Sequence, residues 1–594
     1  MTSNDVQKAR IQIPRAGGQP PVWLRVETAL ELDDFFVVTG WRSEPVEVEM
    51  RSGGVVLDVD TYLRPRNDVA TSLDLKSGDD LGFAIVGKAT KGERIDIAWH
   101  EPMATRIPIT LTPFDDLEGG KLPLPDSEAL RLSRSLPVFG DDWRRVVVGT
   151  TGRRPRTGEA VGNVEFAVVN PQARDGIVSG WFLTGQDPVV TWVETSSGEV
   201  TPLAAATLRE RQDVVDAFAG TYRGETRQPG FALRVPGVVK GDVVKLRAQM
   251  DDGVVDLSDG TVEELPHDPV KAAETIFGLS APSPSRFVDY VDQIALPALG
   301  GLIESRRHEW TRRSILVREY GKLHEGPRVS IVVPLYGRID FVEHQLIEFA
   351  RDEWLLDHAE LIYVVDDPQI LDKCITDAAG LYNLYRVPFR LVWGGVNRGY
   401  SGANNLGAEY SRGDLLLFLN SDAIPQGPGW LESLVDSLET DPEIGAVAPR
   451  LVFGDGSIQH AGMTFRQRAD LGIWVNHHPY MGLDPELDPA AGQDVDVPAV
   501  TGACLLVRRT DFDAVGGWDT GYLIGDFEDS DFCLKLRSNG ERIVYSPATQ
   551  LTHLERQSFT LLGDSSFRLK VVVYNAHRHQ SRWGTMLEEL ADAN

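Results

Sequence analysis

The strongest constraint on the fold is a series of apolar runs, each followed by polar residues. The runs are residues 328–336, 361–365, 389–393 and 414–419. A helix-like stretch lies between the first two, and carboxylates or glycines follow the later ones. Apolar strands that alternate with helices are typical of an open parallel α/β sheet, which binds ligands at the carboxyl ends of its strands. We therefore expect a ligand site at the Asn420-Ser421-Asp422 turn and at its neighbours.

The rest of the chain is long enough for further domains. A single hydrophobic core does not extend over 594 residues, so three or four domains are expected. Lys and Arg total 59 against 88 for Asp and Glu, a net charge of −29. This balance argues against nucleic-acid partners and against broad adhesion to anionic membranes, because both need clustered cations.

Three distant cysteines, Cys374, Cys504 and Cys533, form no CxxC pair, so neither a zinc site nor a disulfide framework is predicted. The first residues lack the apolar centre of a signal peptide, and no run approaches the roughly 18 apolar residues that span a bilayer. We expect a cytoplasmic protein, with peripheral contact at the inner face of the membrane as an alternative.

An internal repeat occupies the first 260 residues. Gly40-Trp41 recurs as Gly180-Trp181, and residues 63–69 recur as residues 208–214 with five of seven positions identical. Short alternating segments around these matches are typical of antiparallel strands. We predict two β-sandwich-like repeats, residues 20–115 and 160–262, followed by a helical linker, residues 268–326.

The repeat and the linker each allow two interpretations. Trp41 and Trp181 would be core anchors in a duplicated scaffold, or exposed platforms in a pair of sugar- or partner-binding modules. Oligomerisation through these modules is a further alternative. The basic stretch at residues 304–313 would be a solvated helix face, or a docking site for an anionic membrane or lipid-linked acceptor.

The glycine-rich segment at residues 394–407 excludes two common chemistries. It lacks the Gly-Lys-Ser/Thr ending of a P-loop, and its glycines do not match GxGxxG. Hydride transfer and phosphoryl transfer through those loops are therefore disfavoured.

Seven segments in order resemble the family 2 glycosyltransferases of GT-A fold. They are residues 329–336, 364–367, 397–407, 413–423, 501–519, 525–540 and 553–558. The segment Gln459-His460-Ala461-Gly462 and the pair His477-His478 look closest to the bacterial O-antigen and polysaccharide branch, including rhamnosyltransferase-like members. The resemblance implies that residues 327–594 form a GT-A domain with a C-terminal helical tail.

The resemblance also implies a nucleotide-sugar site. A uracil or thymine ring offers an N3–H donor, for which Asp366 or Asp367 could be the acceptor, and the resemblance favours Asp367. Pro334 and Tyr336 match the loop along the nucleoside. The remaining residues placed on this side are Asn397, Arg398, Gly402, Asn420, Ser421 and Arg556, with Arg398 and Arg556 as candidate cations for the diphosphate.

A divalent cation is the expected partner of the leaving diphosphate. Mg²⁺ or Mn²⁺ binds through one or two carboxylates together with phosphate oxygens, and Asp422 is the candidate ligand. Asn420 replaces the first aspartate of the family's DxD triplet, which leaves one strong ligand where two would fit. His553 could complete the metal site or contact the diphosphate, although a lone histidine is usually structural.

The resemblance assigns Asp529 as the general base for the acceptor hydroxyl, supported by Glu528. Acidic residues at a helix start also act as caps, which is the structural alternative. Thr501, Gly502, Ala503 and Trp518 match the acceptor side. Cys504 fits a small packed residue better than a nucleophile. His460, His477 and His478 could approach the acceptor or be structural.

The resulting expectation is an inverting glycosyltransferase. It would move a sugar from a UDP- or dTDP-sugar to a saccharide or lipid-linked saccharide acceptor in bacterial surface polysaccharide synthesis. Inversion is implied by the resemblance alone. One alternative is a non-catalytic carbohydrate-binding or scaffold protein with a degenerate GT-A domain, which only Asn420 supports. A nucleotidyltransferase is disfavoured because residues 333–337 carry no basic glycine-rich signature.

Overall fold

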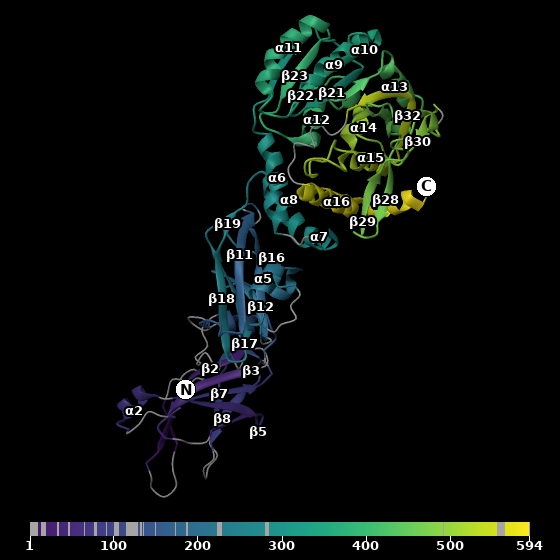
Figure 1. The fold of residues 1–594 in the computed structure, drawn as a ribbon. Coiled ribbons are helices and arrows are strands. Elements are labelled where there is room, and N and C mark those ends of the chain that lie inside the picture. The colour runs from purple at the N-terminus through teal and green to yellow at the C-terminus, as the bar shows by residue number, and fades with distance from the viewer. Residues whose placement is uncertain are drawn as a thin grey trace.

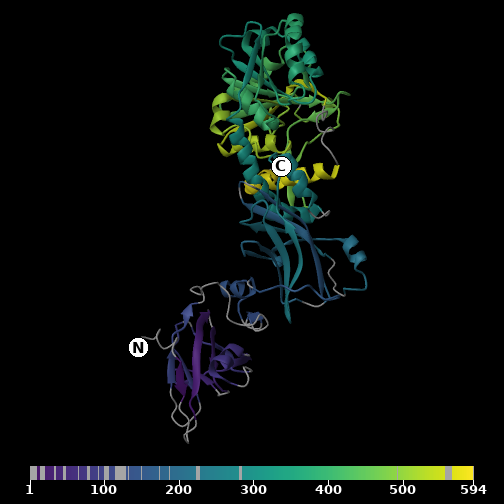
Figure 2. The ribbon, with the colours of Figure 1, turned by 90° about the vertical axis from the view of Figure 1, so that its left-hand side faces the viewer.

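The protein is elongated, with two β modules leading to a larger α/β module (Figures 1 and 2). A computed structural model describes residues 10–13, 20–32, 35–44, 48–64, 66–75, 80–90, 92–99, 106–113, 129–130, 133–134, 136–148, 150–170, 172, 174–185, 188–222, 228–279, 284–490, 492–554 and 565–592. Among these residues, no helix has both the length and the apolar character needed to cross a bilayer.

The first β module contains two sheets. The larger has the order β1 (Ile11–Ile13), β2 (Val22–Leu32), β3 (Phe35–Arg42), β7 (Gly82–Lys88) and β6 (Val59–Arg64), with β10 (Thr112–Pro113) parallel to β2. The smaller has the order β5 (Val55–Val56), β4 (Val48–Ser52), β8 (Ile95–Trp99) and β9 (Arg106–Ile109). Apolar side chains from both sheets share one core, as in a β-sandwich.

The second β module contains the same kind of sheet pair. One sheet has the order β15 (Thr207–Arg209), β16 (Gly230–Pro236), β12 (Asp175–Thr184), β11 (Ala160–Asn170) and β19 (Glu263–Glu264). The other has the order β14 (Val200–Pro202), β13 (Val190–Thr195), β17 (Val243–Met250) and β18 (Gly253–Thr261).

Equivalent strands of the two modules occupy equivalent places. β19 runs parallel to β11 as β10 does to β2, and both long strands carry a register shift at the same point of their pairing. Arg66 pairs with Glu27 and Asp68, as Arg211 pairs with Glu165 and Asp213. Each arginine precedes a short helix, α2 (Asn67–Leu73) or α5 (Gln212–Ala217), and joins the start of that helix to the long strand. Duplication as the origin of this likeness stays a prediction.

The repeated tryptophans differ in environment. Trp41 is 3% exposed and packs in a small cluster beside α2, as a core anchor would. Trp181 is half-buried, and its ring lies 5.3 Å from that of Phe218. Between the modules, α4 (Asp141–Val148) places Trp143 against Trp192 of β13, with ring centroids 5.4 Å apart.

The linker is helical, but its last part belongs to the α/β module. Its helices are α6 (Pro269–Gly278), α7 (Pro284–Tyr290), the π-helical turn η4 (Val291–Ala295) and α8 (Leu296–Trp310). β20 (Leu316–Tyr320) then pairs with β23 at the edge of the large sheet. The predicted boundary at residue 326 is therefore too late. Charged residues on this exposed edge strand hide its β pattern.

The α/β module is built on one large mixed sheet. Its order is β20, β23 (Phe389–Trp393), β22 (Ala359–Val365), β21 (Val329–Leu335), β24 (Leu415–Leu419), β31 (Cys504–Arg508), β26 (Ile444–Val452), β32 (Arg542–His553) and β25 (Ala423–Pro425). Two short strands lie off this path, β27 (Ile458–His460) on β26 and β30 (Val495–Asp496) on β32, and β28 (Thr464–Arg468) pairs with β29 (Ile473–His477) in a separate hairpin.

The predicted parallel strands are confirmed. β21 is parallel to both β22 and β24, and β22 is parallel to β23. The chain runs outward from β21 to β23 and then returns to β24 on the other side of β21. This reversal places the ligand crevice of such a sheet at the carboxyl ends of β21 and β24.

Helices cover both faces of this sheet, which explains why its strands are continuously apolar. One face carries α9 (Asp340–Phe349), α10 (Glu353–His358), α11 (Leu371–Tyr385) and α13 (Trp430–Glu439). The other carries α12 (Gly399–Glu409), α14 (Arg509–Ala514) and α15 (Glu528–Ser538). Alternate residues of β21, such as Ile331 and Val332, belong to the two separate cores. The last helix, α16 (Ser565–Asp592), packs against the linker helices and the β28–β29 hairpin.

One helix lies unusually close to the sheet, and this gives a stability prediction. A Cβ at Gly407 of α12 would overlap the Val332 side chain, whereas a Cβ at Gly380 of α11 would meet open space. Gly407→Ala is therefore expected to lower the free energy of unfolding by about 1–3 kcal/mol. Gly380→Ala is expected to raise it by about 1 kcal/mol, because alanine has the higher helix propensity. Thermal unfolding of both variants beside the wild type checks this, and equal shifts would contradict it.

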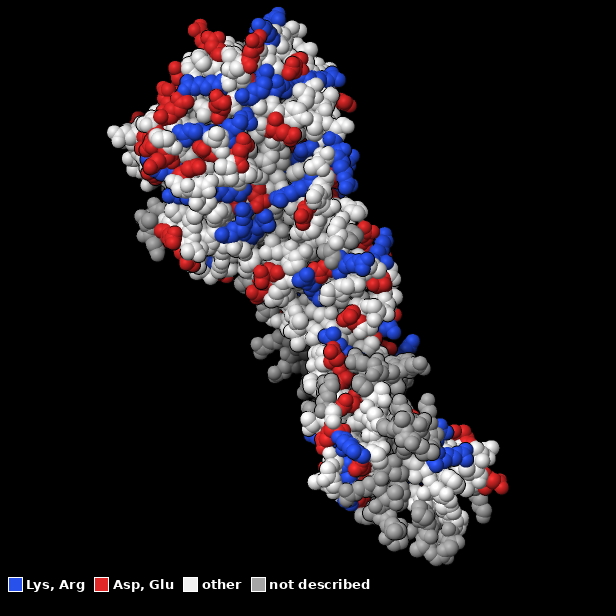
Figure 3. All heavy atoms as spheres, turned by 180° about the vertical axis from the view of Figure 1, so that it is seen from behind, with Lys and Arg blue, Asp and Glu red and all other residues white. Residues whose placement is uncertain are grey.

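Charges are mixed on the surface of the module. Figure 3 shows basic side chains interspersed with acidic ones on the face seen from behind.

Candidate functional site

A cavity of about 820 Å³ lies at the crevice expected from the strand order. Loops that follow β21, β22 and β24 form one side of it, and the start of α15 and the end of β32 contribute further walls. The residues predicted from the sequence that line it are Pro334, Tyr336, Asp366, Asn397, Arg398, Asn420, Ser421, Asp422, Thr501, Gly502, Ala503, Glu528, Asp529 and His553.

His553 reaches the Asn420-Ser421-Asp422 turn through strand pairing. β25 follows the turn and runs antiparallel to β32, with Ala423 opposite His553. β32 passes through a register shift opposite Pro449 and Arg450 of β26, and His553 is its last residue. The Nε2 atom of His553 lies 3.2 Å from Asp422 Oδ1 and 3.4 Å from Asn420 Nδ2.

Gln459 sets the tautomer of His553. The amide nitrogen of Gln459 donates to the His553 carbonyl at 3.3 Å, so its oxygen must face the ring, where it lies 2.6 Å from Nδ1. The Nδ1–H therefore donates to Gln459, and the Nε2 lone pair is directed to the side of Asp422. This is the outer-shell arrangement that metal-binding histidines usually have.

The Asp422–His553 pair fits a divalent cation. An imidazole lone pair and a carboxylate oxygen at 3.2 Å repel each other unless a cation or a proton lies between them. Among the described residues, no set of three or more His, Cys, Asp and Glu side chains surrounds a common point. If a cation binds here, Asp422 and His553 would be its two protein ligands, and phosphate oxygens and water would complete the shell of Mg²⁺ or Mn²⁺.

Two carboxyl groups enter the cavity at the start of α15. Burial and the neighbouring carboxylates raise the pKa of Glu528 well above its ordinary value, and its buried Oε2 has no hydrogen-bond partner among the described residues. Burial also raises the pKa of Asp529, while hydrogen bonds from Thr501 and the Gly502 backbone oppose that shift. The backbone N–H of Ser530 donates to Asp529 at 2.8 Å.

The segment predicted to lie on the acceptor side orients Asp529. Tyr400 donates its hydroxyl to the Gly502 carbonyl at 2.6 Å, and the Thr501 N–H donates to His460 Nε2 at 3.4 Å. His460 is buried, so the pKa of its ring lies well below the ordinary value and the ring is neutral. His460 and His478 line the cavity and lie 3.2 Å apart through their Nδ1 atoms. His477 belongs to the β28–β29 hairpin.

Asp366, and not Asp367, faces the cavity. Asp367 accepts the backbone N–H groups of Gln369 at 2.8 Å and Gly337 at 3.2 Å, which shape the loop after β22. Asp366 lines the cavity and accepts the Arg398 N–H at 2.6 Å. Burial raises the pKa of Asp366 to about 8, so its carboxyl can both donate and accept near neutral pH. The preference for Asp367 that the resemblance implied does not agree with this geometry.

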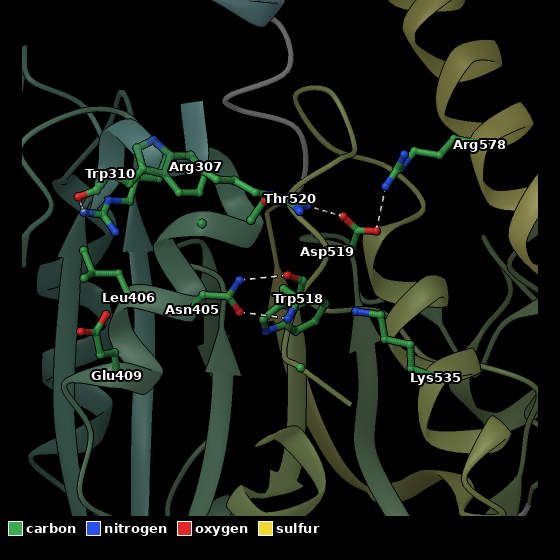
Figure 4. Close-up of a pocket in the computed structure, with 13 residues that line it drawn as sticks. Arg307, Trp310, Asn405, Leu406, Glu409, Trp518, Asp519, Thr520, Lys535 and Arg578 are labelled. Carbon is green, nitrogen blue, oxygen red and sulfur yellow. Dashed lines mark hydrogen bonds and ion pairs between the residues drawn. The ribbon is translucent and has the colours of Figure 1, made fainter. Parts of the chain in front are cut away.

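Two other predicted residues, Trp518 and Gly402, line a different cavity, in which Figure 4 labels Trp518. Trp518 is 2% exposed, lies against Phe532 and lines a second cavity of about 470 Å³. Its backbone is held by the Asn405 amide through two bonds of 2.9 Å. Gly402 lines that second cavity too, where a Cβ would press on Trp310 of α8. These two residues support packing and do not line the large cavity.

Arg398 lines the large cavity, but its guanidinium group is bound by other residues. Its guanidinium lies 5.5 Å from the Trp310 ring and donates to the carbonyls of Gly394 at 3.1 Å and Trp310 at 3.4 Å. These contacts do not favour the predicted role as a diphosphate cation. Arg556, the other predicted cation, lies outside the described residues.

Sequence reasoning missed Arg306, which enters the cavity from α8. It donates to the backbone carbonyl of Asn397 at 2.9 Å and to its Oδ1 at 3.1 Å. Burial lowers its pKa, and the nearby carboxylates, Asp268 first and then Asp366, oppose that shift. The only sequence signal was the basic stretch at residues 304–313, which had been assigned to a solvated face or a docking site. Tyr400 and Gln459 were missed as well, because neither belongs to a charged motif.

Known proteins resemble the α/β module. Residues 330–516 match the model of the family described as Glycosyl transferase family 2. The O-antigen biosynthesis protein RfbC of Myxococcus xanthus is 30% identical over 238 residues, which are 39% of this chain and 18% of that protein. The N-acetylglucosaminyl-diphospho-decaprenol L-rhamnosyltransferase of Mycobacterium tuberculosis is 29% identical over 237 residues, 36% of this chain and 76% of that protein.

A solved structure of GalNAc-T7 with UDP, GalNAc and Mn²⁺ also aligns, at 16% identity and a TM-score of 0.35. The alignment covers 45% of this chain and 49% of that one. The match to RfbC, in contrast, spans less than a fifth of that relative's length.

Proposed function

Because residues 330–516 form a family 2 glycosyltransferase domain, we propose that the chain is an inverting glycosyltransferase of bacterial surface polysaccharide synthesis. It would transfer a sugar from a UDP- or dTDP-sugar to a saccharide or glycolipid acceptor. The main observation behind this proposal is that two pairs of side chains line one cavity. The first is Asp422 with His553, and the second is Glu528 with Asp529.

In this proposal, Asp529 removes the proton of the acceptor hydroxyl. The oxygen attacks the anomeric carbon from the side opposite the diphosphate, and the bond from that carbon to the diphosphate oxygen breaks. The nucleoside diphosphate leaves with the electron pair, and the configuration inverts. A cation held by Asp422 and His553 would neutralise the charge on the departing diphosphate.

Glu528 supports Asp529 by staying neutral. Two adjacent buried carboxyl groups do not readily ionise together, because their negative charges repel each other. Burial also raises the pKa of Glu528 well above the ordinary range. We assign the shared proton to Glu528, which leaves Asp529 free to accept the proton of the acceptor.

We assign the nucleotide to the side of Asp366 and Asn397. Asp366 would bind the N3–H of a uracil or thymine, with Pro334 and Tyr336 along the nucleoside. Tyr336 is 38% exposed, as expected of a platform that a ligand covers. Asn420 and Ser421 would contact the donor beside the cation.

A glycolipid acceptor is supported by apolar side chains in the same cavity. Met481 is 47% exposed and Leu569 of α16 is 49% exposed, and both line it together with Ile524 and Val572. Such a wall suits an acceptor that carries an apolar group beside its sugar. We propose a cytoplasmic protein with peripheral membrane contact, and β modules that act as a scaffold.

Turnover of nucleotide sugars tests the proposed function. Hydrolysis and transfer would be measured with UDP-, dTDP- and GDP-sugars, with Mn²⁺ or Mg²⁺ and with a chelator. Turnover that the chelator removes is expected for a UDP- or dTDP-sugar. If no nucleotide sugar turns over, the enzyme proposal fails and the non-catalytic carbohydrate-binding alternative takes its place.

Arg306 gives a prediction for donor affinity. Arg306→Met removes charge-assisted hydrogen bonds to Asn397, each of which contributes about 1.5–3 kcal/mol. We therefore expect the donor KM to rise by about 10- to 100-fold. The control is Arg312→Met, which changes an exposed cation just beyond α8. A wild-type donor KM in Arg306→Met, or an equal rise in both variants, would contradict the assignment.

A further inference from the structure

The loop that leads into Glu528 and Asp529 has an unfavourable backbone. Ile524, Asp526 and Phe527 have φ values of 66°, 74° and 74°, and they are three of the nine described non-glycine residues with positive φ. Such values are costly for a β-branched or bulky residue. The Gly525 N–H donates to the Leu523 carbonyl at 2.7 Å, which closes a γ-turn of positive φ at Ile524.

Backbone strain of this kind persists only where the surroundings enforce it, and it gathers at functional sites. Phe527 is the residue directly before α15, so its left-handed backbone sets the direction in which Glu528 and Asp529 leave the loop. The strained residues therefore directly precede Glu528 and Asp529 and determine how these two carboxyl groups enter the cavity.

One side chain of α16 holds this loop. Asn575 is fully buried, and its Oδ1 accepts the Leu523 N–H at 3.0 Å. Its Nδ2 donates to the carbonyls of Leu523 at 3.0 Å and Gly525 at 2.7 Å, with a longer contact of 3.4 Å to Asp526. Both ends of one amide thus bind the backbone on either side of Ile524.

The same face of α16 supports the start of α15. His579, one turn beyond Asn575, is buried and lies 3.2 Å from the Ser530 hydroxyl, which itself donates to the Phe527 carbonyl at 3.1 Å. Trp583, a further turn on, donates to Asp531 at 2.8 Å. The C-terminal helix therefore supports both the loop and the start of α15.

We propose that Asn575 is a positioning residue, which holds the loop of residues 521–527 in its left-handed conformation and so aims Asp529 at the acceptor. The inference rests on the proposed function. Asn575 touches no reacting atom in this proposal. It acts through the loop that carries Ile524 and leads to Asp529, so its loss affects the chemical step and the acceptor side, and not the binding of the donor.

The test uses the full chain with Asn575→Ala. We expect kcat to fall by about 10²-fold, the effect of a small misplacement of a catalytic group, while the donor KM stays within about twofold of wild type. Hydrogen–deuterium exchange of residues 521–530 should become faster in the variant. Asn575→Asp is the second variant, since it keeps the acceptor for Leu523 N–H and the side-chain shape but loses the donors.

Gln580→Ala is the matched control. Gln580 lies on the same helix, accepts the Trp474 N–H at 3.0 Å and donates to the Gly472 carbonyl at 3.3 Å, away from the catalytic loop. It should keep wild-type kcat and wild-type exchange at residues 521–530. The proposal is overturned by wild-type kcat in both Asn575 variants, by loss of kcat without faster exchange, or by an equal loss in Gln580→Ala.

The two proposals fail in different ways. If the wild-type chain turns over no nucleotide sugar, the proposed function fails. The exchange comparison needs no substrate, and it then decides alone whether Asn575 holds the loop.

Discussion

Asp529→Asn should remove nearly all sugar transfer while the protein still binds its donor. The substitution keeps the size of the side chain and one accepting oxygen, but it removes the basic carboxylate. General-base help contributes about 10²–10⁴-fold, so we expect kcat to fall by that factor. Donor binding in Mn²⁺, measured by calorimetry, should change little, because the nucleotide and the cation bind to other residues.

The pH dependence gives a second readout of the same prediction. Burial raises the pKa of Asp529, and only the ionised form accepts a proton. Transfer by the wild type should therefore decline as the pH falls through this raised pKa, at a pH above the ordinary range of an aspartate. The decline should be absent from the residual activity of Asp529→Asn.

Glu528→Gln serves as the comparison. If Glu528 holds the shared proton, glutamine resembles its working form, and the loss in kcat should stay below about tenfold. If kcat falls further in Glu528→Gln than in Asp529→Asn, Glu528 is the general base and Asp529 is the supporting residue. Wild-type activity in Asp529→Asn would contradict the general-base assignment altogether.

The sheet could be predicted because its signal is local. In β21, residues on both faces are apolar, since Ile331 and Val332 belong to separate cores. Continuous apolar runs with polar ends thus predicted the strands and the edge that binds ligands. The same logic predicted polar groups such as Asp366 and Asp422 at one edge of the sheet, whereas Asp529, which lines the same cavity, was assigned by the family resemblance.

Contacts between distant segments could not be predicted in this way. Arg306 and Trp310 belong to a helix that looked solvated, and nothing in its local pattern tells which surface it meets. Trp518 was placed by its neighbours in the motif, yet its ring packs beside Phe532 and Tyr400. The side to which a motif residue points depends on packing, which the motif does not specify.

Backbone strain is hidden from the sequence as well. Local rules expect glycine or asparagine where φ is positive, but Ile524 and Phe527 have no such marker. Their conformation depends on Asn575, some fifty residues later in the chain. A prediction from local preferences alone must miss such a loop, because the partner that stabilises it comes from tertiary structure.

The second large effect is expected for substitution of Asp422, the candidate metal ligand, and it concerns donor affinity. Asp422→Ala should abolish the gain in donor affinity that Mn²⁺ provides, because it removes the carboxylate beside His553 Nε2. We expect the Mn²⁺-dependent affinity for UDP to fall by at least about 100-fold, more than a change in the outer shell costs. Calorimetric titration with UDP, in Mn²⁺ and in chelator, measures this difference directly.

A graded series separates a metal ligand from a simple ion pair. Gln459→Leu removes the acceptor that holds the His553 Nδ1–H, and it should weaken Mn²⁺-dependent binding by about 10- to 100-fold. Asn420→Asp restores a second carboxylate at the turn and should tighten it, because divalent cations prefer charged oxygen ligands. If Asp422 and His553 form only an ion pair, neither substitution should alter the difference between Mn²⁺ and chelator. Unchanged Mn²⁺-dependent binding in Asp422→Ala would refute the ligand assignment, and the charge of the leaving diphosphate would then need another partner.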